Sequence, residues 1–152
     1  MALDDIYKEV ILDHYKRPRN KREMPDADRS CSKNNPLCGD EITVFVHEED
    51  GKLLDVSFVG QGCSISQSSA SMMTEAVAGR TLEDVEALAV EVRAMLSGDI
   101  EPDEDEFGEL VALKGVVKYP IRVKCAVLGW DVLQEALEGD GSAEGSSSHA
   151  VA

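Results

Sequence analysis

The amino-acid sequence predicts an α+β domain in which a small antiparallel sheet is covered on one face by helices. Two segments rich in β-branched residues, 41–47 and 52–59, flank an Asp-Gly turn, which is a strong hairpin signal. Apolar residues recur at helical spacing in several later segments. The chain has 152 residues, the length of one ordinary domain. We therefore expect one domain over residues 1–138, followed by a disordered tail rich in Gly, Ser and Ala over residues 139–152.

The N-terminal segment, residues 4–15, is expected to form a helix. Its apolar residues recur at helical spacing, and Pro18 follows shortly after its end. Residues 16–35 are polar and rich in turn formers. This composition indicates a connector, with room for a short strand near residues 29–32.

The predicted hairpin turns at Asp50 and Gly51. Its first strand is the apolar run Ile-Thr-Val-Phe-Val, and its second strand alternates apolar with polar residues. A glycine loop containing Gly60, Gly62 and Cys63 follows the second strand. Strands of an antiparallel hairpin return to the same end, so this loop should lie beside the start of the first strand.

Helices are expected after the hairpin. Residues 64–78 are rich in small Ser and Ala, which permit close packing. Thr81 begins the next helix as its N-cap, and Gly98 ends it. Residues 99–106 are acidic, and we interpret them as a solvated loop.

The last part of the predicted domain contains two further helices. Residues 107–117 are apolar enough for a short helix, and Tyr119-Pro120 interrupts it. Pro120 suits the first turn of a long amphipathic helix that extends to Leu137.

The charge and the composition argue against some classes of partner. The chain carries 30 acidic and 15 basic residues, a net charge of −15, and this field disfavours binding to nucleic acid. No apolar run approaches the roughly 18–20 residues of a membrane span, and no signal pattern opens the chain. We therefore expect a cytoplasmic protein, in which cysteines stay reduced and serve as ligands or nucleophiles more often than as disulfides.

Four side chains are the candidates for one metal centre. Cys38 and Asp40 immediately precede the first hairpin strand, and Cys63 follows the second, so the hairpin brings them together. Cys125 lies in the first turns of the last helix and joins them if that end of the helix faces the loops. Three thiolates and one carboxylate suit tetrahedral zinc. The alternative is that each cysteine is a small buried hydrophobe.

The other cysteine and the histidines are weaker candidates. Cys31 lacks the glycine-rich setting and is interpreted as a free surface or structural cysteine. His14 lies on the apolar side of the first helix, where a packing role is expected. His47 is at the far end of its strand and is expected to face solvent, and His149 is in the tail.

Three motifs resemble those of the SufU family, within the wider group of IscU and NifU N-terminal iron–sulfur assembly proteins. They are Asn-Pro-Leu-Cys-Gly-Asp at 35–40, Gly-Gln-Gly-Cys-Ser-Ile-Ser at 60–66 and Tyr-Pro-Ile-Arg-Val-Lys-Cys-Ala at 119–126. The first helix is also similar to that family's opening segment. Lys124 stands where IscU-like proteins carry a histidine, and the long segment between Gly79 and Pro120 is similar to a SufU insertion. Both features favour the SufU branch.

The resemblance implies a SufE/NifU-like fold and a function. It implies zinc bound by Cys38, Asp40, Cys63 and Cys125, with Cys38 accepting persulfide sulfur from a PLP-dependent, SufS-like cysteine desulfurase. Arg122 would help to engage that partner. This zinc-dependent sulfurtransferase role in iron–sulfur cluster assembly, alongside other assembly proteins, is our leading hypothesis.

Two alternatives remain open at the level of sequence. The same ligands suit a scaffold that assembles and transfers a [2Fe–2S] cluster, because thiolates bind iron as well as zinc. A purely structural zinc site is the other alternative, and it predicts that removal of the metal unfolds the protein.

Overall fold

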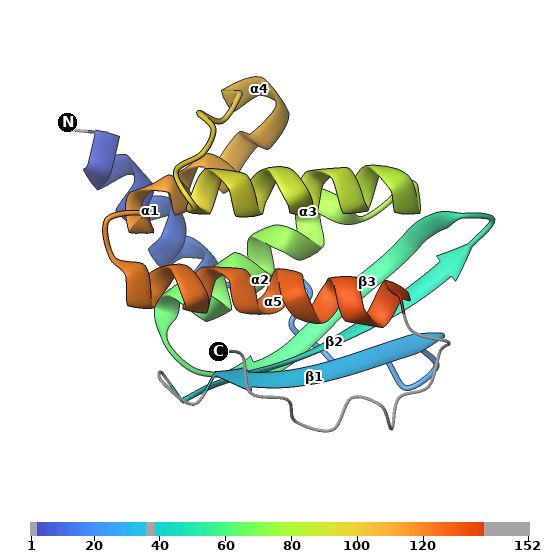
Figure 1. The fold of residues 1–152 in the computed structure, drawn as a ribbon. Helices are drawn as coiled ribbons and strands as arrows, with labels where there is room; N and C mark the ends of the chain where they lie inside the picture. Colours follow the sequence, from blue (N-terminus) through green and yellow to red (C-terminus); the bar gives the residue numbers. More distant parts are fainter. Residues whose placement is uncertain (1–2, 36–38, 139–152) are drawn as a thin grey trace.

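The computed structural model describes residues 3–35 and 39–138, except for the side chains of residues 3–7 and 104. Figure 1 shows the sheet as one layer and the helices stacked together against one face of that sheet. The elements are α1 (Leu3–Lys16), β1 (Arg29–Asn35), β2 (Asp40–Glu49), β3 (Lys52–Gln61), α2 (Ser64–Val77), α3 (Leu82–Leu96), α4 (Glu104–Phe107), the 3₁₀ helix η1 (Gly108–Val116) and α5 (Pro120–Glu138).

The sheet of the described chain has three antiparallel strands in the order β1-β2-β3. The predicted hairpin is confirmed: Glu41 pairs with Gln61 at one end and Glu49 with Lys52 at the other. Asp50 and Gly51 have φ values of 55° and 77°, the left-handed conformation that a tight hairpin turn requires. The short strand predicted near residues 29–32 is present and longer than expected: β1 pairs with β2 from Arg29 to Asn35.

One face of the sheet is buried beneath the helices, as the fold-class prediction required. In β2 the residues Ile42, Val44 and Val46 are fully buried, and the two residues between them, Thr43 and Phe45, are partly exposed. Helices α2 and α5 cover this face, and Trp130 of α5 and Phe58 of β3 are among the largest fully buried side chains. Burying a side chain such as Phe58 stabilises a fold by roughly 1.5–3 kcal/mol.

Helices α2 and α5 pack closely because small residues lie between them. A Cβ on Gly129 would lie 3.4 Å from the Cβ of Ala70. The buried Ser69 hydroxyl donates a hydrogen bond of 2.6 Å to the carbonyl oxygen of Ala126. The expected close packing of the Ser/Ala-rich helix is therefore confirmed, and it fixes the start of α5 relative to α2.

The acidic segment differs from its predicted form. Residues 99–106 were expected to be a solvated loop, but the short helix α4 begins at Glu104. The Asp103 carboxylate caps it by accepting a 2.9 Å hydrogen bond from the Asp105 N–H, and Phe107 anchors it with 4% exposure. The helix expected over residues 107–117 is mostly the 3₁₀ helix η1, which begins at a left-handed Gly108 (φ 56°). Within the described part of the chain, no helix combines the length and apolar character needed to cross a bilayer.

Candidate metal centre

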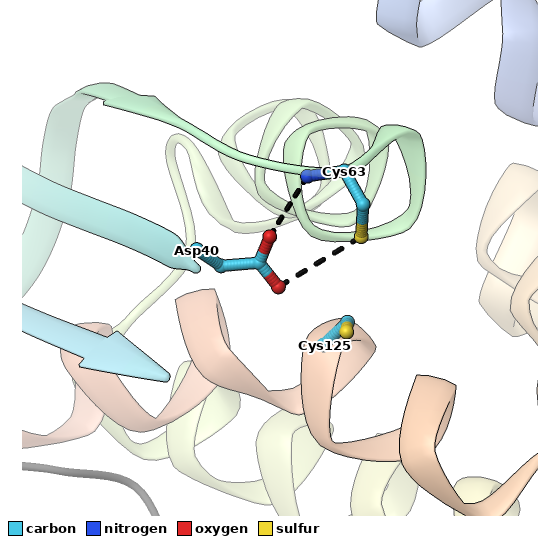
Figure 2. Close-up of side chains that lie close together, drawn as sticks. All are labelled: Asp40, Cys63 and Cys125. Atoms are coloured by element: carbon cyan, nitrogen blue, oxygen red, sulfur yellow. Dashed lines mark hydrogen bonds between the residues drawn. The ribbon is translucent and has the colours of Figure 1, made fainter. Parts of the chain in front are cut away.

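Three of the predicted ligands meet at one end of the sheet. Asp40 begins β2, Cys63 follows β3 and Cys125 belongs to α5, and Figure 2 shows their side chains turned toward one another. One carboxylate oxygen and the two sulfur atoms all lie within 4.8 Å of one another. We call these three residues the Cys–Asp cluster.

Hairpin register and one glycine bring Asp40 to Cys63. Because Glu41 pairs with Gln61, the next residues along both strands, Asp40 and Gly62, lie level with each other. Gly62 has a φ of 146°, and a Cβ on it would lie 2.2 Å from the Asp40 Oδ1. Only glycine permits this approach, because any side chain would displace the carboxylate.

Cys63 is held by contacts on both sides. Its N–H donates a 2.8 Å hydrogen bond to the Asp40 Oδ1, and its thiol lies 3.8 Å from the Asp40 Oδ2. Cys63 is also the N-cap of α2, with its Sγ accepting a 3.5 Å hydrogen bond from the Ser66 N–H. Helix N-termini favour negative charge at the capping position.

Cys125 approaches from the helical layer. It is fully buried, and its Sγ lies 3.7 Å from the carbonyl oxygen of Ile121, one turn earlier in α5. The hydrogen bond from Ser69 to the adjacent Ala126 ties this turn to α2. The Cys125 thiol is therefore positioned by helix packing and not by a loop.

The donor set fits a metal ion. Asp40 is 0% exposed, and none of the ion pairs between described residues includes it. A buried carboxylate needs a compensating charge, and two neighbouring thiols add further acidic groups. A bound divalent cation would supply that charge. Thiolate and carboxylate ligands suit zinc, and thiolates also suit iron in clusters.

The other two predicted site residues have different outcomes. Cys38 lies outside the described residues. Arg122 is exposed near the start of α5, one turn before Cys125, and it lines an adjacent pocket with Lys118 and Tyr119. It is not one of the three residues whose ligand atoms converge.

The remaining cysteine and two histidines lie elsewhere. Cys31 is a buried residue of β1, 6% exposed, opposite Val44, and burial raises the pKa of its thiol. It is therefore structural, one of the two options left by the sequence. His47 is 44% exposed, as expected, and its Nδ1 lies 2.8 Å from Asp28 Oδ2. His149 and the predicted tail lie outside the described residues.

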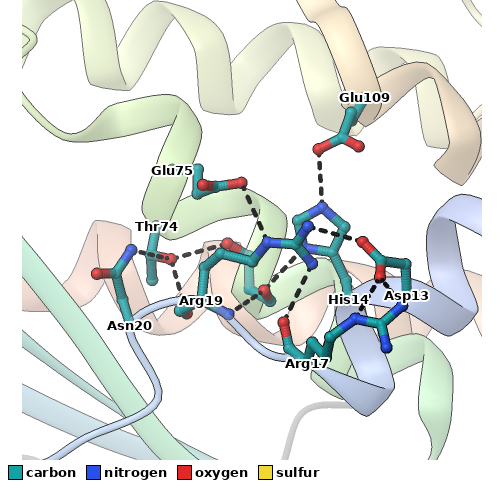
Figure 3. A network of polar contacts seen from close by, with 9 residues as sticks. Asp13, His14, Arg17, Arg19, Asn20, Thr74, Glu75 and Glu109 are labelled. Carbon is teal, nitrogen blue, oxygen red and sulfur yellow. Dashed lines mark hydrogen bonds and ion pairs between the residues drawn. The ribbon is translucent and has the colours of Figure 1, made fainter.

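A second polar cluster surrounds His14, which is fully buried (Figure 3). Its Nδ1 lies 2.8 Å from Ser71 Oγ, and its Nε2 lies 2.9 Å from Glu109 Oε1. His14, Glu75 and Glu109 each offer one ligand atom, and these three atoms lie within 4.8 Å of one another. We call these three residues the His14 cluster. The sequence predicted a packing role for His14, which is confirmed, but spacing gave no signal for its partners because they lie on α2 and η1.

Arginines run along this second cluster. Arg19 lies 3.8 Å from Glu75 and 2.7 Å from Asp13. Hydrogen bonds from Arg19 and then Arg17 hold the pKa of the Asp13 carboxyl below its ordinary value. The Arg19 N–H also donates to Ser71 Oγ, so the network joins α1, its following connector and α2.

The fold and the thiol-containing site together define a class. The family model of the NifU-like N terminal domain matches residues 6–139, and the chain belongs to that family. It is a member of the group of iron–sulfur cluster assembly proteins that includes both scaffold and SufU proteins.

Individual relatives sharpen this placement. The chain is 40% identical over 142 residues to a Streptococcus pyogenes serotype M1 protein named iron-sulfur cluster assembly scaffold protein IscU, covering 93% of this chain and 89% of the relative. It is 41% identical over 135 residues to the Bacillus subtilis zinc-dependent sulfurtransferase SufU, covering 89% and 91%. The crystal structure of a SUF-system scaffold protein from Fervidobacterium islandicum superposes with a TM-score of 0.81 at 34% identity, covering 90% and 99%.

Proposed function

We propose that this protein is a zinc-dependent sulfur acceptor that takes persulfide sulfur from a PLP-dependent cysteine desulfurase for iron–sulfur cluster assembly. The observation that carries the proposal is the convergence of a buried carboxylate and two thiols within 4.8 Å. Cys38 is the proposed fourth ligand and the sulfur-accepting residue. It precedes Asp40 by two residues, and two residues of chain span at most about 7 Å.

The residues have distinct roles in the proposed transfer. Zinc, when bound, would keep its cysteine ligands as thiolates. The Cys38 thiolate attacks the outer sulfur of the desulfurase persulfide and forms a new S–S bond. The bond from that outer sulfur to the desulfurase cysteine breaks, and its electron pair leaves with the desulfurase sulfur as a thiolate. No net oxidation occurs, so no further redox reagent is needed.

Asp40, Cys63 and Cys125 form the stable part of the proposed site. Asp40 lies against the glycine at position 62, and it accepts a hydrogen bond from the Cys63 N–H. Cys125 is positioned by the packing of α5 on α2. Each of these contacts joins residues within the described part of the chain. We expect them to persist while Cys38 carries the sulfur.

Arg122 is proposed to engage the desulfurase. It is exposed on the first turn of α5, on the same helix as Cys125. A cation at this position complements acidic groups on a partner and steers its approach to the acceptor.

A second function is supported by the same donor set. Two thiols and a carboxylate would also accept iron, and the Streptococcus relative is named as a scaffold at nearly the same identity as the SufU relative. In this alternative a [2Fe–2S] cluster is cargo that the protein assembles and passes on. We favour sulfur transfer because Lys124, and not a histidine, precedes Cys125.

The test is sulfur loading by a purified cysteine desulfurase with cysteine as substrate. Wild type should gain one sulfur atom by mass spectrometry and should stimulate turnover, because Cys38 accepts the persulfide. Cys38→Ala should show neither effect. The matched control, Cys31→Ala, should behave as wild type because that thiol is buried opposite Val44, four residues along β2 from Asp40, and is not among the converging ligand atoms. Loading of Cys38→Ala at the wild-type level would overturn the role of Cys38.

Anaerobic purification separates the two functions. Stoichiometric zinc that iron and sulfide do not displace supports sulfur transfer. A coloured protein with acid-labile sulfide, which passes a cluster to an apo-protein, supports the scaffold function.

A further inference from the structure

Helix α2 contains a run of serines whose hydroxyl groups have different partners. Their small size was expected to permit close packing, but the structure also gives four of them separate hydrogen bonds. Ser69 and Ser71 connect α2 to neighbouring segments of the chain. Ser66 and Ser68 instead donate to the carbonyl oxygens of residues three positions earlier in the chain. For Ser66 that residue is Cys63, a member of the Cys–Asp cluster.

Ser66 holds Cys63 at two points. It is fully buried, its hydroxyl donates a 3.1 Å hydrogen bond to the Cys63 carbonyl oxygen, and its N–H donates the 3.5 Å bond to the Cys63 Sγ. The side-chain amide of Gln67, 3% exposed, donates a 3.4 Å hydrogen bond to the Ser66 Oγ. Because this oxygen already accepts from Gln67, the single hydroxyl proton of Ser66 is directed to the Cys63 carbonyl.

These contacts leave the Cys63 thiol little freedom to move. The Cys63 N–H donates to Asp40 Oδ1 at 2.8 Å, and its carbonyl oxygen accepts from the Ser66 hydroxyl and, at 3.2 Å, from the Gln67 N–H. The peptide groups on both sides of the Cys63 Cα are therefore fixed. The remaining rotation is χ1, and the bond from the Ser66 N–H to Sγ selects the orientation in which the thiol lies 3.8 Å from Asp40 Oδ2.

The hydroxyl bond of Ser66 contributes little to the helix itself. A serine that bonds a carbonyl one turn earlier in its own helix slightly destabilises the helix and often bends it. The Cys63 carbonyl also accepts the regular helical bond from the Gln67 N–H. Ser66 is therefore a second donor to a carbonyl that the helix has already satisfied, and its effect is to fix the position of Cys63.

We propose that Ser66 is a positioning residue that keeps Cys63 bound to the metal. This inference rests on the proposed function, because it assumes that zinc binds at the Cys–Asp cluster. A sulfur atom that is already oriented loses less freedom when it binds, so its bond to the metal is harder to open. Cys63 is partly exposed whereas Cys125 is buried. Of these two thiols, Cys63 is therefore the one that reagents in solvent reach and the one that gains most from such support.

The test is Ser66→Ala, which removes the hydroxyl and leaves the N–H in place. Competition with a chromogenic chelator should show zinc affinity weakened by about tenfold, in the range seen when the support of a ligand is lost. In the zinc-loaded protein, iodoacetamide should alkylate Cys63 faster by about the same factor, because the thiolate reacts only after it has left the metal. Mass spectrometry of the digested protein separates Cys63 from Cys125, whose alkylation rate should not change.

Ser68→Ala is the matched control. Its hydroxyl is also fully buried and donates a 3.3 Å hydrogen bond to the carbonyl oxygen of Ile65, again three residues earlier. Both variants should lower the urea midpoint of the metal-free protein by similar amounts, because each loses one buried hydrogen bond of the same kind. Ser66→Ala alone should change zinc affinity and the alkylation of Cys63, which separates positioning of the ligand from a general loss of stability.

The possible failures are distinguishable. If wild type binds no zinc, the proposed function fails and this inference fails with it. If wild type and Ser66→Ala bind zinc with equal affinity, the positioning role is wrong while the proposed function stands. If Ser68→Ala weakens zinc affinity as much as Ser66→Ala does, the loss comes from a loosened α2, and the role of Ser66 is overturned.

Discussion

Two polar clusters in this protein each bring three metal-ligating atoms within 4.8 Å, yet their surroundings differ. In the Cys–Asp cluster a buried carboxylate lies beside two thiols, and no ion pair between described residues compensates it. In the His14 cluster the histidine bonds Glu109, and Arg19 lies 3.8 Å from Glu75.

Proximity of ligand atoms therefore does not by itself define a metal site. The acidic groups of the His14 cluster already have protein partners, so a cation would have to displace them. In the Cys–Asp cluster the Asp40 carboxylate accepts a hydrogen bond from the Cys63 N–H, but none of the ion pairs between described residues includes it, and two soft sulfur ligands lie beside it. We expect the His14 cluster to stabilise the packing of α1 on α2, and only the Cys–Asp cluster to bind metal.

Removing a thiol from the Cys–Asp cluster should have the largest effect on metal binding. Cys63→Ala and Cys125→Ala should each weaken zinc affinity by more than about 100-fold, because losing even a supporting contact of a ligand typically costs 10–100-fold. Competition with a chromogenic chelator measures the affinity. Cys31→Ala is the matched control and should keep the wild-type value. Equal zinc affinity in all three variants would remove the Cys–Asp cluster from the site.

Replacing the buried histidine tests the other cluster. His14→Ala should lower the free energy of unfolding by about 2–4 kcal/mol, because it opens a cavity and leaves the buried Ser71 hydroxyl without one partner. Urea denaturation measures this loss, and the zinc content of the folded protein should not change. His47→Ala, at a half-exposed ion pair, should cost less than about 1 kcal/mol. Loss of zinc in His14→Ala would show that the two clusters had been assigned the wrong roles.

A smaller effect is expected from a change that alters no ligand. Gly62→Ala would place a Cβ 2.2 Å from the Asp40 Oδ1, so the carboxylate must move. Zinc affinity should fall by about tenfold, in the range seen when the support of a ligand is lost. Gly79→Ala is the control: its φ is also positive (83°), but its Cβ would meet nothing within 4 Å. It should cost about 1 kcal/mol of stability and leave zinc affinity intact.

The smallest effect concerns pH and the cysteine outside both clusters. Burial raises the pKa of the Cys31 thiol in the folded state, so above the ordinary value of 9.0 the unfolded state loses this proton first. The unfolded state then binds fewer protons, and stability falls as pH rises. The stability advantage of wild type over Cys31→Ala should therefore be full below pH 9 and shrink above it. A difference that grows with pH would contradict a buried, protonated thiol.

Sequence periodicity accounts for most of the fold. The Asp50-Gly51 turn, the β-branched run in β2 and the alternation in β3 define the hairpin, and Thr81 marks the start of α3 because its side chain caps the Asp84 N–H. The sequence-based prediction was wrong at Glu104. The acidic composition of residues 99–106 predicted a solvated loop, but the buried Phe107 anchors a helical turn that begins at Glu104. Local composition does not reveal such a tertiary contact.

The candidate site was accessible from sequence for a geometric reason. Hairpin register places Asp40 beside Cys63 whatever the rest of the fold does. Whether Cys125 reaches Asp40 and Cys63 depends on how α5 packs on the sheet. The sequence alone did not determine that packing. The network of His14 with Glu109 depends on contacts between elements far apart in the chain, so no local spacing encodes it.

The most direct test of the central claim is X-ray absorption spectroscopy at the zinc edge of the zinc-loaded protein. Cys38, Asp40, Cys63 and Cys125 predict three sulfur neighbours at about 2.3 Å and one oxygen at about 2.0–2.2 Å. Asp40→Ala should replace or remove the oxygen and retain the three sulfurs. Four sulfur neighbours in wild type would bring Cys31 into the site, and a shell of nitrogen and oxygen alone would place the metal elsewhere. Either result would contradict the account.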